Sequence, residues 1–184
     1  DHLPQGRAGG GHRAHEKNGK KKAQVRDFKR KDSDTRSGLV EADDRQGSGR
    51  SLWRGRVTLR VLLDTAILIF AVQSPERLSS RAVAVLKNPE NVRELSSVSL
   101  TEIAIKTTLG KLKFSAEFVR QAIQDMDIRI LPFTAAHAYR LFDLPAHHRD
   151  PFDRQIIAQA LSEDIPVVTS DEKFKAYEEI TIVW

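Results

Sequence analysis

The sequence predicts an α/β fold for residues 57–184, a three-layer sandwich with a mainly parallel central sheet. Short apolar runs, typical of strands buried on both faces, alternate in this part of the chain with stretches of helical periodicity. Strands separated by helices favour parallel pairing through right-handed crossovers, with helices on both faces of the sheet. Acids follow two of the predicted strands, at the ends where such folds bind ligands.

Residues 1–56 have a different composition. They contain 15 Lys and Arg against 8 Asp and Glu, and nine of the ten glycines of the chain. With few aromatic or branched apolar side chains, they cannot bury enough surface to offset the entropy lost on ordering. We expect a disordered basic tail, either solvated or serving as an electrostatic arm for nucleic acid. A translation start at Val57 would leave this tail out of the native protein.

The overall composition excludes several classes of protein. The 184-residue chain has no cysteine, which rules out disulfides and thiolate-bound zinc. It has no run of 18 apolar residues and a hydrophilic start, so we expect no membrane span, no signal peptide and a cytoplasmic location. The net charge of +5 comes from the tail, because residues 57–184 carry 15 basic and 17 acidic side chains.

The first strand is expected at 61–63. A helix at 66–72 follows it, Pro75 interrupts the pattern, and a second helix at 79–87 ends before Pro89. These segments supply one buried strand and two short apolar helices.

The next pair of elements is a strand at about 94–97 and a helix that begins at Ser99. Ser99 and Glu102 match a capping box, in which a serine caps the first helical turn and a glutamate three residues later bonds back to it. Gly110 is a natural stop for this helix. Capping alone would explain Glu102 without any chemistry.

The second half of the domain repeats the alternation. Asp150 is expected to cap a helix with Pro151 at its first position, where a missing N–H costs nothing. The expected elements, in order, are a helix at 115–126, a strand at 128–131, a helix from Thr134 to about 142, a helix at 151–163, a strand at 165–170, a short helix near 173–177 and a strand at 180–183.

Four acids occupy comparable positions in this pattern. Asp64 and Asp171 follow strands, whereas Glu102 and Asp153 lie in the first turns of predicted helices. Regular crossovers would bring all four to one edge of the sheet, where their mutual repulsion would favour a bound cation. Mg²⁺, or Mn²⁺, prefers oxygen ligands and can activate water for attack on a phosphodiester. The pattern favours a metal-dependent nuclease, although acids at these positions also cap helices.

Four motifs carry a family resemblance: VLLDT at 61–65, SLTEIAIK at 99–106, HHRDPFDR at 147–154 and VTSD at 168–171. Together they resemble the PIN domain of VapC-type toxins, over residues 59–184. The resemblance implies a Mg²⁺-dependent endoribonuclease that cuts RNA and is inhibited by a cognate antitoxin. By position it implies a metal site of Asp64, Glu102, Asp153 and Asp171, with Asp64 and Asp153 as direct ligands.

Four more side chains are candidates for substrate contact. The hydroxyls of Thr65 and Ser170 stand beside two of the acids, and the guanidinium groups of Arg149 and Arg154 suit bidentate contacts with phosphate. The structural alternative is a cap for each hydroxyl and an ion pair for Arg154.

Other polar residues near the motifs have simpler interpretations. We interpret His147 and His148 as surface-loop histidines rather than as groups that contact phosphate. Lys106 either guides an RNA backbone or lies on a solvated helix face.

Two other functions fit parts of the pattern. A response-regulator-like phosphoacceptor needs paired acids after its first strand and a lysine after a late strand, and the sequence has neither. A catalytically silent protein that binds an antitoxin and an operator is the alternative to a nuclease. We also expect a homodimer. The apolar helices at 66–86 are candidate surfaces for a second copy or an antitoxin, with core packing as the alternative.

Overall fold

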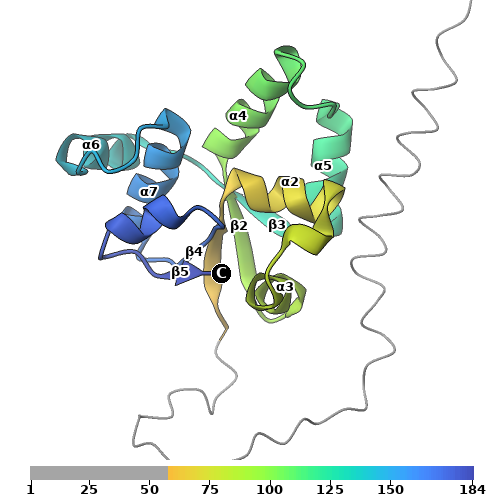
Figure 1. The fold of residues 1–184 in the computed structure, drawn as a ribbon, viewed down its shortest axis with the longest axis horizontal. Helices are drawn as coiled ribbons and strands as arrows, with labels where there is room; N and C mark the ends of the chain where they lie inside the picture. The colour runs from red at the N-terminus through yellow and green to blue at the C-terminus, as the bar shows by residue number, and fades with distance from the viewer. Residues whose placement is uncertain (1–57) are drawn as a thin grey trace, which may run out of the picture.

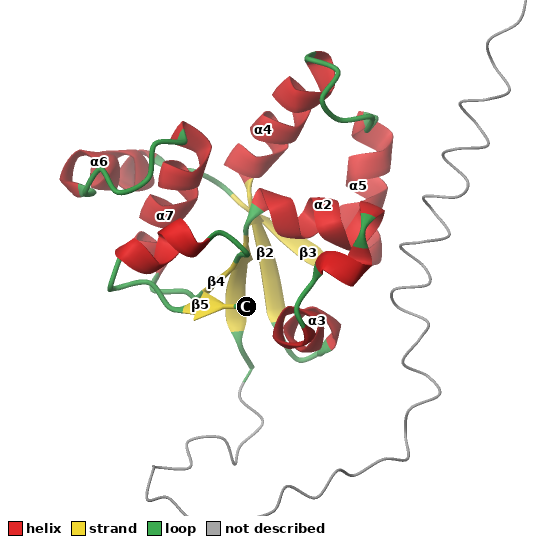
Figure 2. Ribbon diagram, viewed as in Figure 1, coloured by secondary structure: helices red, strands yellow, loops and turns green. Residues whose placement is uncertain are grey.

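Five parallel strands form the centre of the computed structural model, which describes residues 58–184 (Figures 1 and 2). The predicted tail at 1–56 lies outside the described residues, as does Val57. The strand order is β3-β2-β1-β4-β5. The strands are β1 (Arg60–Leu63), β2 (Val92–Ser96), β3 (Ile128–Leu131), β4 (Val167–Val168) and β5 (Ile182–Val183).

Six α-helices and two short 3₁₀ helices connect these strands. They are α2 (Thr65–Gln73), η1 (Pro75–Arg77), α3 (Ser80–Lys87), α4 (Ser97–Thr108), α5 (Ala116–Asp125), α6 (Ala135–Asp143), α7 (Pro151–Glu163) and η2 (Glu172–Ala176). The expected elements at 58–184 are therefore present in the expected order.

The sheet has a core on each face, which confirms the three-layer sandwich. Val61 and Leu63 of β1 pack into one cluster with apolar side chains of α2, α3, α4 and α5, whereas Leu62 packs into a second with α7 and η2. All three side chains are fully buried. Figure 2 shows α2, α3 and α5 on one side of the strands and α6 and α7 on the other.

The apolar helices at 66–86 contribute much of the first core. Ile67, Leu68, Val72, Ala82 and Leu86 are all buried there. Core packing therefore accounts for these side chains, and they are not free for a partner. No helix in the described part of the chain is long and apolar enough to cross a membrane.

The helix at α4 does not begin where the capping box predicts. Ser96, the last residue of β2, is its N-cap, and the Ser96 hydroxyl accepts the Val98 N–H at 3.1 Å. Ser99 is instead buried within the helix, and Glu102 lies in its second turn. Sequence reasoning chose the wrong serine because β2 runs into α4 without a loop. Gly110, with φ of +72°, follows the helix end as predicted.

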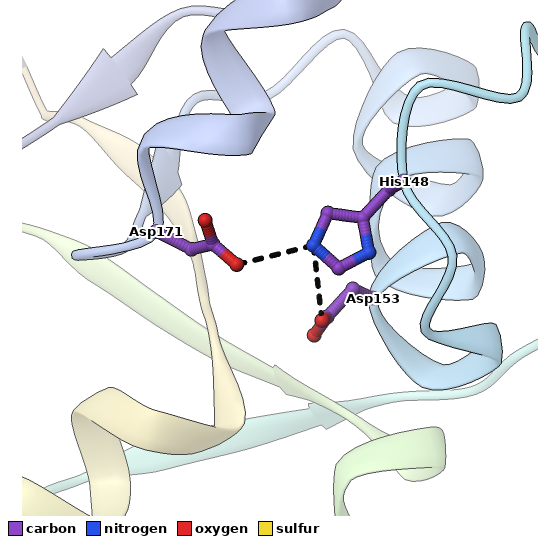
Figure 3. Close-up of side chains that lie close together, drawn as sticks. All are labelled: His148, Asp153 and Asp171. Atoms are coloured by element: carbon purple, nitrogen blue, oxygen red, sulfur yellow. Dashed lines mark hydrogen bonds and ion pairs between the residues drawn. The ribbon is translucent and has the colours of Figure 1, made fainter.

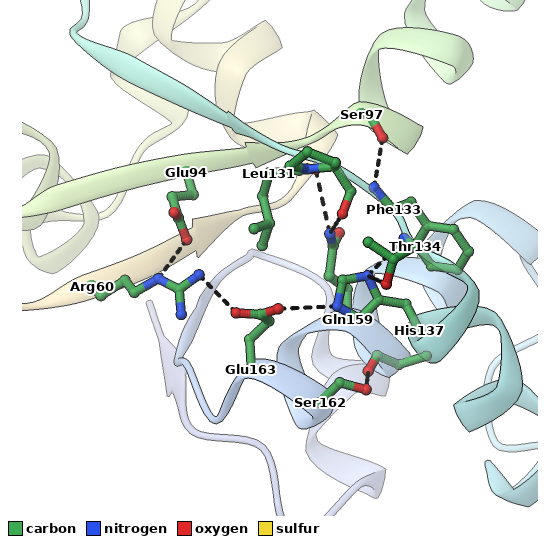
Figure 4. Close-up of polar contacts among 12 residues, drawn as sticks. Arg60, Glu94, Ser97, Leu131, Phe133, Thr134, His137, Gln159, Ser162 and Glu163 are labelled. Atoms are coloured by element: carbon green, nitrogen blue, oxygen red, sulfur yellow. Dashed lines mark hydrogen bonds and ion pairs between the residues drawn. The ribbon is translucent and has the colours of Figure 1, made fainter.

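A polar network ties α7 to the sheet (Figure 4). Arg60 of β1 contacts Glu94 and Glu163, each at 2.8 Å, and Glu163 also lies 3.1 Å from Nε2 of His137. The other ring nitrogen of His137 accepts the Thr134 N–H at the start of α6. The C-terminal end of α7 is therefore fixed against β1 and α6, which sets the direction of its N-terminal end.

Candidate metal centre

Asp64 lies where the strand order of the sheet changes direction. It follows β1, whose neighbours are β2 on one side and β4 on the other, and it caps α2 by accepting the Ala66 N–H at 3.3 Å. The hydroxyl of Thr169, the residue after β4, donates to Asp64 Oδ2 at 2.7 Å. Ligands of open α/β sheets bind at such a switch point.

The Asp64 carboxyl is 5% exposed, and burial raises its pKa. The hydrogen bonds from Thr169 and Ala66 act in the opposite direction, whereas the negative charges of Glu102 and Asp171 raise the pKa further. Acids from β1, α4 and the segment after β4 therefore share one electrostatic environment. Such an arrangement favours a cation.

Glu102 of α4 provides a buried carboxylate with one oxygen unused. Its Oε1 is paired with Nζ of Lys106 one turn later, whereas its Oε2 is buried without a hydrogen-bond partner among the described residues. Ser99, one turn earlier, and Thr65 have buried hydroxyls that also lack a partner there. Unsatisfied buried oxygens are uncommon, and they are suitable donors for a hard cation.

Lys106 partly neutralises these acids. Partial burial opposes its charge, but the hydrogen bond and charge of Glu102 and the charges of Asp150 and Asp153 raise its pKa. The ammonium group therefore contacts Glu102 of the acid cluster, while the Lys106 side chain stays 41% exposed to solvent.

Asp153 lies in the first turn of α7, after the cap at Asp150, which accepts the Phe152 N–H at 2.9 Å. Burial raises the pKa of Asp153 to about 7, and the charges of Asp64, Asp150 and Glu102 act in the same direction. The structure thus brings Asp153 close to the acids of β1 and α4. Without a cation, this site holds a carboxylate under strong repulsion.

Asp171 closes the site from the segment after β4. Burial would raise its pKa, but hydrogen bonds from the Lys173 N–H and from His148, together with the charge of Lys173, lower it overall. The Lys173 bond, at 2.9 Å, makes Asp171 the N-cap of η2.

His148 is the residue of this site that sequence reasoning misplaced. It is 4% exposed, and its Nε2 lies 3.1 Å from Asp171 Oδ2 and 3.4 Å from Asp153 Oδ2 (Figure 3). The interpretation as a surface-loop histidine is therefore wrong for His148 and correct for His147, which is exposed. Atoms of His148, Asp153 and Asp171 that could bind a metal lie within 4.8 Å of one another.

A family comparison decides what kind of domain holds this site. The model of the PIN domain family matches residues 61–180, a span that contains all four acids. The chain belongs to the PIN domain family. PIN domains are generally metal-dependent nucleases. The predicted resemblance to a PIN domain is therefore confirmed.

Several solved structures are similar to this chain at low sequence identity. VapBC2 from Rickettsia felis, bound to a promoter DNA fragment, is 20% identical over 67% of this chain and 97% of its own, with a TM-score of 0.49. FitAcB from Neisseria gonorrhoeae is 17% identical over 67% and 96%, with a TM-score of 0.48. VapBC-5 from Mycobacterium tuberculosis, a member of the VapBC family of toxin–antitoxin systems, is 21% identical over 67% and 97%, with a TM-score of 0.44. No curated protein matches the chain.

The predicted substrate-contact residues of this PIN domain have diverse surroundings. Arg149 is exposed in the loop before α7. The guanidinium of Arg154 donates to the carbonyls of Leu144 and Pro145, at 3.0 and 2.7 Å, instead of pairing with an acid.

The two predicted hydroxyls lie in different surroundings. The Thr65 hydroxyl is buried at the start of α2. Ser170 is half-buried and lines a cavity of about 220 Å³ with Asp171 and Trp184. Sequence reasoning missed Thr169, whose hydroxyl bonds Asp64, but the pairing of Leu63 with Val168 places the residues after them side by side.

Proposed function

We propose that this PIN domain is a Mg²⁺-dependent endoribonuclease and the toxin of a toxin–antitoxin system. The observation that carries the nuclease part is the gathering of Asp64, Glu102, Asp153 and Asp171 at one edge of the sheet, with Glu102 Oε2 left without a partner among the described residues. The toxin part rests on the motifs that resemble VapC.

The donor set fits a hard divalent cation. It consists of carboxylates, which Mg²⁺ and Mn²⁺ prefer, and Lys106 pairs with one of them, Glu102. Asp64, Glu102 and Asp153 would hold the ion, with Asp171 completing the site. When bound, such an ion polarises a phosphodiester, lowers the pKa of water and stabilises the charge of the leaving oxygen.

The other residues prepare the site for this chemistry. Thr169 fixes Asp64 through the bond to Oδ2, and Lys106 pairs with Glu102 and offsets its charge. Arg149, exposed beside the cap of α7, is placed to contact an RNA phosphate. Arg154 stabilises the loop that carries Arg149, because its guanidinium donates to the Leu144 and Pro145 carbonyls.

The antitoxin would bind away from the acids. An apolar groove of about 650 Å³ lies between α4 and α5, and its lining includes Leu100, Ile103, Val119, Ile123 and Ile130. Ile130, on the edge strand β3, is 39% exposed, and an antitoxin segment in the groove would remove it from water. Association with a second copy of the chain stays a prediction.

A nuclease assay separates this proposal from the catalytically silent alternative. Purified protein is incubated with single-stranded RNA and with DNA of the same sequence, with Mg²⁺ or EDTA, and the fragment ends are sequenced. We expect Mg²⁺-dependent RNA cleavage that is lost in Asp64→Asn and Glu102→Gln and retained in Asp143→Asn, an exposed acid on α6. Equal RNA cleavage by Asp64→Asn would refute the metal site, and no cleavage by the wild type would favour the silent alternative.

A further inference from the structure

The imidazole of His148 lies between two acids of the site, Asp153 and Asp171. It comes from the loop before α7, whereas Asp153 and Asp171, which it contacts, come from α7 and from the segment after β4 (Figure 3). Its ring also packs edge-on against Phe174, with 5.8 Å between the ring centroids. A buried polar ring so close to two predicted metal ligands is either a third ligand or a group that orients them.

The hydrogen bonds of the ring distinguish these two roles. Nδ1 of His148 accepts the backbone N–H of Asp150 at 3.2 Å. An acceptor nitrogen carries a lone pair, so the ring proton of the neutral imidazole is on Nε2. Nε2 therefore donates to Asp171 Oδ2 at 3.1 Å, with Asp153 Oδ2 3.4 Å away, and it has no lone pair for a metal in this tautomer.

The backbone around His148 holds the ring in this orientation. The His148 N–H donates to the Tyr177 hydroxyl at 2.9 Å, and that hydroxyl donates to the Pro145 carbonyl at 3.0 Å. Arg154 donates to the same carbonyl and to that of Leu144. The loop that carries His148 is thus fixed at both ends, and the direction of its Nε2–H is fixed with it.

The Nε2–H of His148 helps to set the orientation of the Asp171 carboxylate. Asp171 Oδ1 accepts the Lys173 N–H and Oδ2 accepts from His148, so both oxygens are oriented. We propose that His148 is a positioning residue, which donates its Nε2–H to Asp171, lies against Asp153, and holds the two carboxylates for a divalent cation without being a ligand itself. This role rests on the proposed function of the site.

Two substitutions of His148 test the role by metal affinity. His148→Phe keeps a ring against Phe174 but removes the donor, whereas His148→Gln places an amide N–H near the position of Nε2. With Mn²⁺ binding measured by electron paramagnetic resonance, we expect about 10- to 100-fold weaker binding in His148→Phe. Most of the affinity should return in His148→Gln, and His147→Phe, at the exposed neighbour, should bind as the wild type does.

The ring nitrogens of the wild-type protein report directly on the same question. ¹⁵N spectra of the histidine rings are recorded for the full chain before and after addition of Mg²⁺, with the His148 signals assigned by their loss in His148→Gln. We expect the Nε2–H tautomer in both states. A move of the proton to Nδ1 on Mg²⁺ addition would show that His148 is a ligand and would overturn the proposal, even if His148→Phe does not fold.

The outcomes separate this role from the proposed function. Unchanged Mn²⁺ affinity in folded His148→Phe overturns the positioning role while leaving the nuclease intact. Wild-type protein that binds Mn²⁺ but does not cleave RNA contradicts the nuclease, whereas the affinities of the variants still decide the role of His148.

Discussion

The Asp153→Asn substitution should stabilise the metal-free protein at alkaline pH. Burial raises the pKa of Asp153 to about 7, and the charges of Asp64, Asp150 and Glu102 act in the same direction. Asparagine has nearly the same shape and no charge. The variant therefore removes the repulsion and leaves the packing of α7 in place.

The magnitude follows from the difference between the two protonation equilibria. The folded-state pKa of about 7 lies above the ordinary value of 3.8, so the folded protein binds this proton more tightly than the unfolded chain does. The protonated Asp153 carboxyl makes its full contribution to the free energy of unfolding below pH 3.8. This contribution is lost as the pH rises to about 7. At about 1.4 kcal/mol per pKa unit, the difference between the folded-state pKa and the ordinary value corresponds to about 4 kcal/mol of unfolding free energy. The side chain is 20% exposed, and solvent screening reduces the effect to about 2 kcal/mol.

Urea unfolding in EDTA at pH 8 and at pH 4.5 measures this effect. At pH 8, we expect the free energy of unfolding of Asp153→Asn to exceed that of the wild type by about 2 kcal/mol, and at pH 4.5 the gain should fall to about 1 kcal/mol or less. Mg²⁺ at pH 8 should stabilise the wild type more than the variant. Asp143→Asn, at an exposed acid of α6, is the matched control and should show no gain. An equal gain for Asp153→Asn at both pH values would refute the electrostatic reasoning.

Three further substitutions test the groups around the acids. Thr169→Val removes the donor to Asp64 Oδ2 and should lower the free energy of unfolding, measured in urea, by about 1–2 kcal/mol. Lys106→Met removes the cation that competes for Glu102, and calorimetry should show about tenfold tighter Mn²⁺ binding, or about 1.4 kcal/mol. Arg154→Ala frees two carbonyls before α7 and should lower the free energy of unfolding by about 2 kcal/mol, with faster proteolysis of that loop.

Each of these variants has a control in the same chain. Thr108→Val removes an exposed hydroxyl bonded within its own helix, Lys111→Met removes an exposed charge, and Arg149→Ala removes an exposed guanidinium of the same loop as Arg154. If a control changes its measured quantity as much as the matching test variant, the contact assigned to that test residue is not the cause.

The order of the elements follows from local signals in the sequence. Asp150 and Pro151 set the start of α7 as predicted, because a cap and the residue after it act within one turn. The local signal is ambiguous where several residues could cap the same helix. Ser96, Ser97 and Ser99 could each cap α4, and in the structure Ser96 is the N-cap. Parallel pairing of β2 decides between them, and that pairing is not a local property.

The candidate site was predictable only in part, for the same reason. Asp64 could be placed because the apolar run at 61–63 marks a buried strand, and Asp64 directly follows it. Its bond to Thr169 spans 105 residues, and the contact of His148 with Asp171 spans 23, so neither is encoded in a short motif. Both depend on the register of β1 and β4 and on the path of the loop before α7.

Crystals grown with MnCl₂ and measured at the manganese absorption edge test the central claim most directly. We expect an anomalous peak bounded by the carboxylates of Asp64, Glu102 and Asp153, with metal–oxygen distances of about 2.0–2.2 Å. The peak should disappear in crystals of Asp64→Asn. A fully occupied peak elsewhere on the protein, or no peak among these three carboxylates, would contradict the account.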